Sequence, residues 1–326
     1  MRLEPNQAPY EGGWVFSSTG DIIRRRVLPP ERVQFGRLGL ASRNLTHFAV
    51  SGATALAQGV FAAFFPSDCR LCGTPLTNIS RLPVCQSCLL AMAPISGASC
   101  EICGEGLSAV TSQLQTRLCG SCQTTRPHFE KAAAYGPYES ELRELIHLLK
   151  YEQVASAVGV LGRMLGEAIQ KLELSTRPVL LIPVPLHRSK RRERGFNQAE
   201  LVARVALKGI ELRAELATDV LERTRLTVSQ IGLTRSQRTE NIRGAFRVTH
   251  LRRVVGQEVL LVDDVLTTGT TANECARVLR KAGAKKIWVA TIARTFKEGA
   301  GKFGVDPEMR KENRSEVSAI SGVKAS

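Results

Sequence analysis

Runs of consecutive apolar residues alternate along the second half of the chain with longer stretches in which apolar residues recur every three or four positions. The runs predict strands, over residues 131–135, 179–184, 259–262 and 286–292. The periodic stretches predict helices, over residues 142–149, 158–172 and 198–207 and from about residue 271 onward. Strands that alternate with helices imply right-handed crossovers and a parallel sheet, so we expect an α/β domain over residues 124–296.

The rest of the chain lacks this alternation. Residues 1–43 mix Pro, Gly and Arg without periodicity and predict a flexible extension, and the polar residues 297–326 predict a disordered tail. Residues 66–123 are rich in Gly, Ser and Pro and poor in long apolar runs. This middle segment has too little apolar material for a core of its own, so a small domain there needs bound metal to fold.

Residues 44–65 form an apolar segment, and residues 49–65 within it carry no charge. Such a stretch is compatible with membrane insertion or with the apolar part of a signal peptide. Its scattered polar and Gly residues, and a length below that of a comfortable membrane span, favour an amphipathic helix that packs on the cysteine-rich segment. We therefore expect no stable insertion into a membrane.

Eight of the nine cysteines fall into four C-x-x-C pairs within residues 66–123. The pairs are Cys69 and Cys72, Cys85 and Cys88, Cys100 and Cys103, and Cys119 and Cys122. Eight thiolates suffice for two tetrahedral sites with no position left for water, so two structural Zn²⁺ ions are expected. Sequential pairing, the first pair with the second and the third with the fourth, needs the shortest loops, although crossed pairing is also open.

Redox-active dithiols are the alternative for these cysteines, but they fit one pair on a helix better than four pairs in a glycine-rich segment. Gly73 and Gly104 directly follow two of the pairs, as expected of knuckles whose backbone N–H groups turn toward the sulfurs. Metal-bound cysteines rather than disulfides are typical of a reducing compartment, which predicts a cytoplasmic protein. The ninth cysteine, Cys275, is expected to be a small core residue.

The 326 residues include 45 Lys and Arg against 30 Asp and Glu, which gives a formal net charge of +15 and a pI near 9.8. A chain of this length allows two domains, and its hydrophobic content of 43% is ordinary for a globular protein. The positive charge favours an anionic partner, either a phosphorylated small molecule or nucleic acid, and does not decide between them.

Two adjacent acids follow the predicted strand 259–262, at the edge of the sheet where α/β proteins bind ligands. We expect Asp263 and Asp264 to accept hydrogen bonds from the vicinal hydroxyls of a ribose. The turn after them offers backbone N–H groups and hydroxyls at the start of a helix, and the residues expected to bind a phosphate are Thr267, Thr268, Gly269, Thr270 and Thr271. A threonine-capped helix that binds nothing is the plainer alternative, and the paired acids argue against it. The turn lacks a Walker A lysine and no G-x-G-x-x-G precedes it, which argues against ATP hydrolysis and dinucleotide binding.

The segment after the predicted strand 179–184 is strongly basic and is expected at the same edge of the sheet. Arginine forks there, together with Mg²⁺, would stabilise the charge of a leaving pyrophosphate. The candidates for this role are Arg188, Lys190, Arg191 and Arg194. A solvated loop without a ligand is the alternative for an exposed basic run.

The paired acids and the threonine-rich turn resemble the phosphoribosyl-pyrophosphate (PRPP) motif of the type I phosphoribosyltransferases. Further segments are similar to the ComF family of bacterial competence-associated, phosphoribosyltransferase-like proteins, namely the cysteine pairs and residues 145–151, 182–187, 194–198 and 238–246. The resemblance implies a type I phosphoribosyltransferase-like parallel sheet flanked by helices, preceded by a small cysteine-rich double zinc-ribbon domain.

The same resemblance implies that the basic residues 223–253, with eight arginines and the single acid Glu240, form a mobile hood over the site. A hood that closes over substrate excludes water, so that transfer is favoured over hydrolysis. Its candidate contacts are Arg235, Arg238 and Arg243.

Two functions follow from the resemblance. The first is an enzyme that binds PRPP with Mg²⁺ and transfers its phosphoribosyl group to a nitrogen acceptor with loss of pyrophosphate. The second is a non-catalytic accessory protein of DNA uptake that binds a nucleotide or single-stranded DNA and acts with competence helicase-type proteins. An aromatic content of 5% leaves few rings for stacking bases, yet arginine contacts to phosphates stay open. The residues name neither the acceptor base nor the oligomeric state.

Overall fold

The computed structural model describes most of the chain between residues 67 and 297. The described ranges are residues 67–76, 81–107, 117–227 and 235–297, with the short antiparallel strands β1 (Trp14–Phe16) and β2 (Ile22–Arg24). The remainder of the predicted extension 1–43, the apolar segment 44–65 and the tail beyond residue 297 lie outside the described residues. The helices that are described include none long and apolar enough to cross a membrane.

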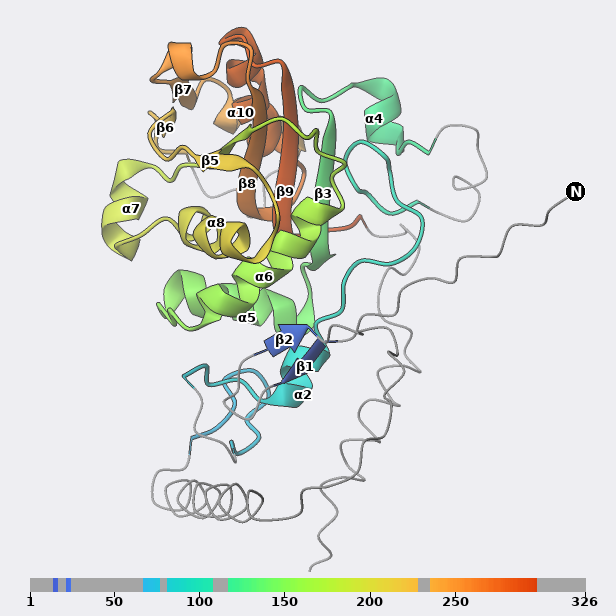
Figure 1. Cartoon of the computed structure of the whole chain (residues 1–326), viewed down its shortest axis with the longest axis vertical. Coiled ribbons are helices and arrows are strands. Elements are labelled where there is room, and N and C mark those ends of the chain that lie inside the picture. Colours follow the sequence, from blue (N-terminus) through green and yellow to red (C-terminus); the bar gives the residue numbers. More distant parts are fainter. Residues whose placement is uncertain are drawn as a thin grey trace, which may run out of the picture. The chain divides into compact units, whose positions relative to one another are not determined.

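A five-stranded parallel sheet forms the centre of the α/β domain, in the order β3–β9–β8–β4–β5 (Figure 1). Its strands are β3 (Lys131–Pro137), β4 (Val179–Pro183), β5 (Ala214–Leu216), β8 (Glu258–Leu266) and β9 (Lys286–Arg294). The strand β8 lies in the middle, between β4 and β9, and its apolar half is fully buried. The parallel sheet and the four strands predicted from apolar runs are confirmed.

Helices cover both faces of the sheet (Figure 1). They are α5 (Ser140–Tyr151), α6 (Ala157–Gln170), α7 (Arg188–Arg194), α8 (Gln198–Gly209), α9 (Arg235–Ile242) and α10 (Thr270–Lys281). The connections through α5, α6 and α8 move across the sheet in one direction and the connection through α10 moves in the other. Right-handed crossovers therefore place α10 on the face opposite to α5, α6 and α8.

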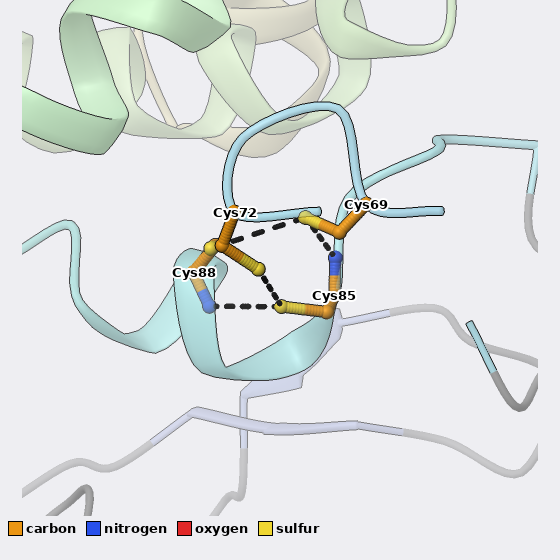
Figure 2. Close-up of side chains that lie close together, drawn as sticks. All are labelled: Cys69, Cys72, Cys85 and Cys88. Atoms are coloured by element: carbon orange, nitrogen blue, oxygen red, sulfur yellow. Dashed lines mark hydrogen bonds between the residues drawn. The ribbon is translucent and has the colours of Figure 1, made fainter. Parts of the chain in front are cut away.

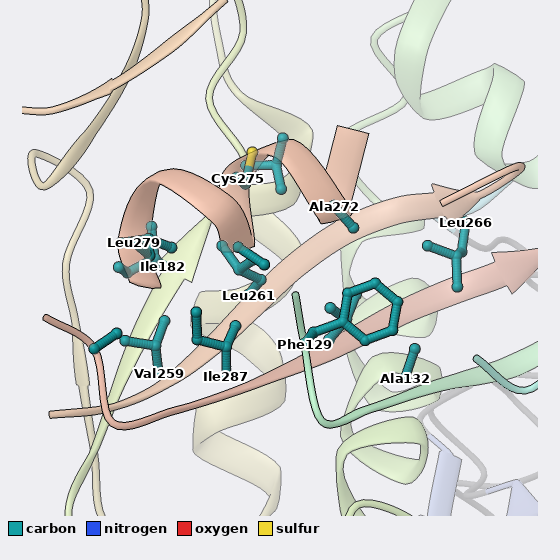
Figure 3. Packing of buried hydrophobic residues seen from close by; sticks show 14 of the residues in the cluster. Phe129, Ala132, Ile182, Val259, Leu261, Leu266, Ala272, Cys275, Leu279 and Ile287 are labelled. Carbon is teal, nitrogen blue, oxygen red and sulfur yellow. The ribbon is translucent and has the colours of Figure 1, made fainter. Parts of the chain in front are cut away.

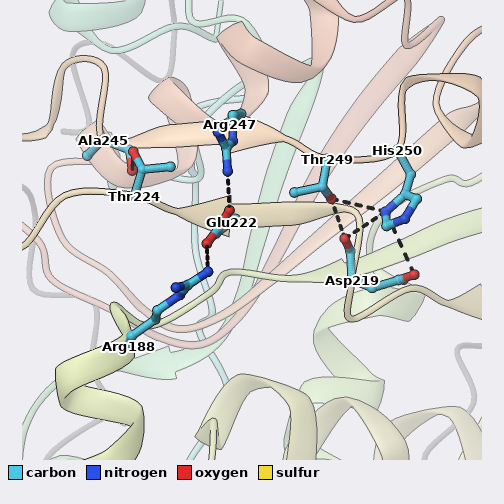
Figure 4. Close-up of polar contacts among 8 residues, drawn as sticks. All are labelled: Arg188, Asp219, Glu222, Thr224, Ala245, Arg247, Thr249 and His250. Carbon is cyan, nitrogen blue, oxygen red and sulfur yellow. Dashed lines mark hydrogen bonds and ion pairs between the residues drawn. The ribbon is translucent and has the colours of Figure 1, made fainter.

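Residues 221–253, which contain the predicted hood, include a two-stranded antiparallel sheet, called the hood hairpin below, and α9, which packs on α10. The hairpin strands are β6 (Leu221–Arg223) and β7 (Phe246–Val248), followed by a 3₁₀ turn over Leu251–Arg253. The base of the hairpin is held by Asp219, whose carbonyl accepts a hydrogen bond from Thr249 and whose carboxylate lies 3.8 Å from His250 Nδ1 (Figure 4). Residues 228–234, in the middle of the predicted hood, lie outside the described residues.

The apolar core between the sheet and α10 includes Phe129 and Leu261 (Figure 3). The same core extends into the second half of the cysteine-rich segment through Cys100, Cys119 and Cys122. Full burial of an aliphatic or aromatic side chain contributes about 1.5–3 kcal/mol, so packing on the α/β domain stabilises this half of the segment. Cys69 and Cys88 are buried as well but lie outside this cluster.

Two elements differ from the sequence prediction. The sequence analysis predicts no helix for the basic residues after β4, whereas Arg188–Arg194 form α7. Arg, Lys and Glu favour helices, His187 accepts a hydrogen bond from Ser189 N at the start, and Gly195 ends the helix in the left-handed region. The strand β8 continues past residue 262 to Leu266, so both acids lie inside the strand rather than after it.

Candidate functional site

The threonine-rich turn joins β8 to α10 and leaves the start of that helix open to an anion. Gly269 is the N-cap residue, with a φ of +75° in the left-handed region that favours glycine. It has no side chain, and no side-chain hydrogen bond caps this end of α10. Residues 267–271 are half-buried, and the hydroxyls of Thr268 and Thr270 lie 2.6 Å apart. The turn thus combines a helix N-terminus with hydroxyl groups that remain accessible, as a phosphate site requires.

A cavity of about 470 Å³ opens beside this turn. It is lined by residues 266–270, by residues of α9 and of the first turns of α10, and by residues of the cysteine-rich segment. Its basic lining residues are Arg126, Arg238, Arg243, Arg277, Arg294 and Lys297, against the acids Glu105 and Glu274. The volume suits a nucleotide-sized ligand, and the charge suits a phosphorylated one.

Asp263 lies on the face of β8 that is covered by α10 and the hood. Its charged neighbours there include Arg223 of β6, and the Cys275 thiol of α10 is also close. Burial, followed by repulsion from the Asp264 carboxylate, raises the pKa of Asp263 from 3.8 to about 7. Asp263 Oδ1 also accepts a hydrogen bond of 2.9 Å from Asp264 N, at a point where β4 has ended and offers no ladder partner. This carboxyl group is therefore poised to exchange a proton near neutral pH.

Asp264 lies on the opposite face of β8 and is held by side chains from two helices. Its Oδ2 atom is 3.0 Å from Lys150 Nζ of α5 and accepts a hydrogen bond of 2.7 Å from Gln198 Nε2 of α8. Burial by itself would lower the pKa of Lys150, but the Asp264 carboxylate outweighs it and the pKa is raised. Both partners of the ion pair are largely buried, and both contacts of Asp264 are made by its Oδ2 atom.

Adjacent residues of a strand point to opposite faces, and the contacts of the two acids follow that rule. Asp263 faces the hood, whereas Asp264 faces α5 and α8. The structure therefore does not bring the two carboxylates together on one surface. The roles predicted for them stay predictions.

The four basic residues predicted to bind pyrophosphate all lie on α7, and three of them already have partners. Arg188 donates a hydrogen bond of 2.8 Å to Glu222 of the hood hairpin (Figure 4). Arg191 is 3.8 Å from Glu200, and Arg194 donates to Gln198 at 3.1 Å while stacking on the Tyr151 ring. Lys190 is exposed.

Of the three hood arginines predicted from the resemblance, Arg238 and Arg243 line the cavity, and the side chain of Arg235 lies outside the described residues. A hood arginine without a predicted role, Arg223, lies against the Phe246 ring and near Asp263. Its Nε atom is buried and has no hydrogen-bond partner in the part of the chain that the structure describes.

The eight paired cysteines form two separate clusters, each with four sulfurs within 4.8 Å of one another. The first set is Cys69, Cys72, Cys85 and Cys88 (Figure 2), and the second set is Cys100, Cys103, Cys119 and Cys122. The predicted sequential pairing is confirmed.

The spacing of the sulfurs fits Zn²⁺. Sulfur distances are 3.6 Å between Cys72 and Cys85 and 3.6 Å between Cys103 and Cys119. Zn–S bonds of about 2.3 Å put the corners of a tetrahedron about 3.8 Å apart, whereas a disulfide needs about 2.0 Å. All nine cysteines are free thiols in the structure. The donor set, four soft thiolates and no oxygen, favours a closed structural zinc site.

Sequence reasoning gave no role to three residues that surround the site: Lys150, Gln198 and Arg294. Lys150 ends a helix that is otherwise apolar on its buried face, and Arg294 directly follows the apolar part of β9. A charge at the end of a buried element, on the edge where the acids lie, was the signal that could have identified both. The partners Asp264 and Glu105 are distant in sequence, so the pairs themselves could not be read from the chain.

Two family models match the chain. Residues 193–316 match the phosphoribosyl transferase domain, and residues 60–123 match the double zinc ribbon domain. The domain boundaries predicted from the sequence stay predictions.

Curated relatives match most of the chain. A protein named DNA utilization protein YhgH from Escherichia coli O6:H1 is 31% identical over 234 residues, which cover 71% of this chain and 98% of the relative. Competence protein F from Haemophilus influenzae is 30% identical over 235 residues, with the same coverage. Competence protein ComFC from Bacillus subtilis is 24% identical, over 65% of this chain and 84% of the relative.

Proposed function

The chain belongs to the ComF family of phosphoribosyltransferase-like proteins, and on this premise we propose that it binds the ribose 5-phosphate part of PRPP or of a nucleotide. The phosphoribosyl group of PRPP is then transferred to a nitrogen acceptor. The acceptor lone pair forms the new C1′–N bond while the C1′–O bond breaks and its electron pair leaves with pyrophosphate. Mg²⁺ bound with PRPP would neutralise part of the charge on that leaving group.

One observation carries the proposal: the half-buried, uncapped turn at residues 267–270 opens into a cationic cavity of nucleotide size. A helix N-terminus with a left-handed glycine and hydroxyls binds a phosphate dianion without a dedicated cation. Arg238 and Arg243 of the hood reach the same cavity and supply positive charge.

In this proposal the two aspartates have different roles. Asp263 faces the hood and accepts from a ribose hydroxyl, and its carboxylate also stabilises positive charge that develops at C1′. Asp264 keeps Lys150 and Gln198 in place on the other face of β8. The residues of α7, Arg188 above all, contact pyrophosphate once they leave their present partners.

A non-catalytic role in DNA uptake is the second candidate. It is supported by the names of the relatives, which refer to competence and DNA utilization, and by the engagement of Asp264 in an internal ion pair. In that role the turn binds the phosphate of a nucleotide or of single-stranded DNA, and the partners are helicase-type competence proteins in the cytoplasm.

Calorimetric titration with ribose 5-phosphate and PRPP, followed by a screen of nucleobases and amines for pyrophosphate release, tests the proposal. We expect Gly269→Ala to weaken ribose 5-phosphate about tenfold or more, because a Cβ strains the left-handed N-cap. We expect Asp263→Asn to abolish pyrophosphate release.

The matched variant Asp264→Asn should retain ribose 5-phosphate binding, because the side-chain contacts of Asp264 are to Lys150 and Gln198 within the protein. If the wild type binds neither phosphate ester, the proposed site is wrong. If it binds them but releases no pyrophosphate with any acceptor, the non-catalytic role stands, and single-stranded DNA binding that weakens steeply with salt would support it.

A further inference from the structure

The cavity is lined by the second cysteine set as well as by the α/β domain. Cys103, Cys119 and Cys122 line the cavity together with residues 266–270, so a ligand on the phosphate turn has the second zinc ribbon as a neighbour. Residues 100–107 are also tied to the sheet, since Ala132 N donates a hydrogen bond of 2.6 Å to Ile102 O.

Arg294 connects this ribbon to the phosphate turn. It is the register partner of Leu266, the last residue of β8 before the turn, and Thr295 N donates to Leu266 O at 3.1 Å. Its guanidinium donates to Glu105 Oε2 at 2.7 Å and lies 3.7 Å from Cys103 Sγ. Glu105 also accepts from the backbone N–H of Lys297 at 3.1 Å. The ribbon therefore fixes the orientation of an arginine that stands beside the turn.

The guanidinium of Arg294 has N–H groups beyond those that hold it to the ribbon. The residue is 4% exposed and lines the cavity, and both hydrogen bonds that its guanidinium donates to described residues come from Nη2. Its Nε atom is buried without a partner among the described residues and is shielded from solvent. Arginine donors are suited to phosphate oxygens.

The charge of the cavity matches one phosphate monoester. Six lining Arg and Lys side chains face two Glu side chains. When Zn²⁺ is bound, a site of four thiolates carries a net charge of −2. The remaining charge of the lining is +2, which a phosphate monoester dianion neutralises.

We propose that the second zinc ribbon forms one wall of the phosphate pocket, and that Arg294, held by Glu105 and Cys103, donates a guanidinium N–H to the phosphate monoester bound at the turn. Arg294 is thus a ligand-binding residue, and Glu105 is a positioning residue. The ribbon's second cysteine set is required for ligand affinity, whereas the first set is not. This inference rests on the proposed phosphate site.

The chain offers a matched pair of cysteines for the test. Cys88 and Cys122 are both buried, both close a C-x-x-C pair, and both lie on five-residue helices, α2 (Gln86–Leu90) and α4 (Gly120–Thr124). Zinc content is measured for Cys88→Ser and Cys122→Ser, and each is titrated with ribose 5-phosphate. We expect Cys122→Ser to weaken binding about tenfold or more and Cys88→Ser to change it less than about twofold. Equal losses in the two variants would overturn the inference.

Arg294→Lys tests the donor itself, because lysine keeps the charge beside Glu105 and lacks the guanidinium fork, which can hold Glu105 and a phosphate at the same time. We expect ribose 5-phosphate to bind about tenfold more weakly and its bound ³¹P resonance to shift, with two zinc ions per chain and an unchanged melting temperature. Should Cys122→Ser fail to fold, the result for Arg294→Lys decides whether the inference holds. An unchanged affinity in Arg294→Lys refutes the inference and leaves the phosphate site standing. No binding of ribose 5-phosphate or inorganic phosphate by the wild type refutes the proposed function itself, and the inference with it.

Discussion

At the scale of single residues, Asp263 and Asp264 are neighbours in sequence with opposite electrostatic surroundings. Asp264 lies against a buried lysine, and Asp263 lies in a desolvated position beside the negative charge of Asp264. Burial therefore raises the pKa of Asp263 to about 7. Asp263 can therefore change its protonation state near neutral pH, whereas Asp264 is the ion-pair partner of Lys150.

The raised pKa of Asp263 makes the stability of the protein depend on pH. A carboxyl whose pKa is higher in the folded than in the unfolded protein favours folding at low pH, and that contribution is lost as the pH rises through the folded-state value. We expect the free energy of unfolding of the wild type to fall, relative to Asp263→Asn, between about pH 4 and about pH 7. The slope of the difference is at most about 1.4 kcal/mol per pH unit. Urea unfolding at several pH values measures it, and parallel curves for the two proteins would contradict the shift.

The sequence allowed the acids, the turn and the metal ligands to be selected, because each is a local pattern of a few adjacent residues. It did not allow the surroundings of those residues to be predicted. Lys150 reaches Asp264 from a helix more than a hundred residues earlier, and only the completed sheet brings them together. Both acids were expected after the strand, where they could face one ribose. The strand β8 includes them, so their side chains point to opposite faces of the sheet.

At the scale of elements, the basic helix α7 is tied to the hood by a single acid. Glu222 of β6 accepts from Arg188 of α7 and from Arg247 of β7, both at 2.8 Å (Figure 4). The hydrogen bond from Arg247 and, to a smaller extent, the one from Arg188 lower the pKa of Glu222. Because Arg188 is largely exposed, this contact is weak and a pyrophosphate can displace it.

We therefore predict that Glu222→Gln strengthens pyrophosphate binding roughly two- to threefold, because Arg188 no longer has to leave a carboxylate. Thermal stability should change little. Titration calorimetry with pyrophosphate measures the effect, and Glu215→Gln is the control, since it removes an ion pair to Arg253 without touching Arg188. Equal pyrophosphate affinity in the wild type, Glu222→Gln and Glu215→Gln would exclude Arg188 from the pyrophosphate site.

The large elements were predictable and the small ones were not. Apolar runs and helical periodicity identified β3, β4, β8 and β9 and the long helices. The helix α7 has no buried residue, and β5 to β7 are three residues long, so neither leaves an apolar pattern in the sequence. Their formation depends on capping, as at His187, or on the partner strands beside them.

At the scale of the whole molecule, the two cysteine sets have unequal surroundings. Three cysteines of the second set, Cys100, Cys119 and Cys122, belong to the apolar core of the α/β domain. The first set includes Cys72, which is exposed. Thiolates within a core are less accessible to a chelator than thiolates at the surface.

We predict that a chelator removes the two zinc ions in order, the first set before the second. Native mass spectrometry during exposure to chelator should show a one-zinc species that keeps the circular dichroism spectrum of the intact protein. Loss of the second ion should then lower the melting temperature, because metal-free cysteines leave unpaired thiols inside the core. Simultaneous loss of both ions, or a melting temperature that falls with the first, would contradict this order.

The hydrogen bond between Glu105 and Arg294 spans 189 residues. During translation the ribbon leaves the ribosome early, and the strand that ends in Arg294 leaves it late. A nascent chain that stops before β9 has the cysteines and the threonine turn, but it lacks Arg294 and cannot complete the cavity between them. At the proposed phosphate site, ligand binding would thus have to wait until nearly the whole fold has been synthesised, and a phosphate ester would report completed folding.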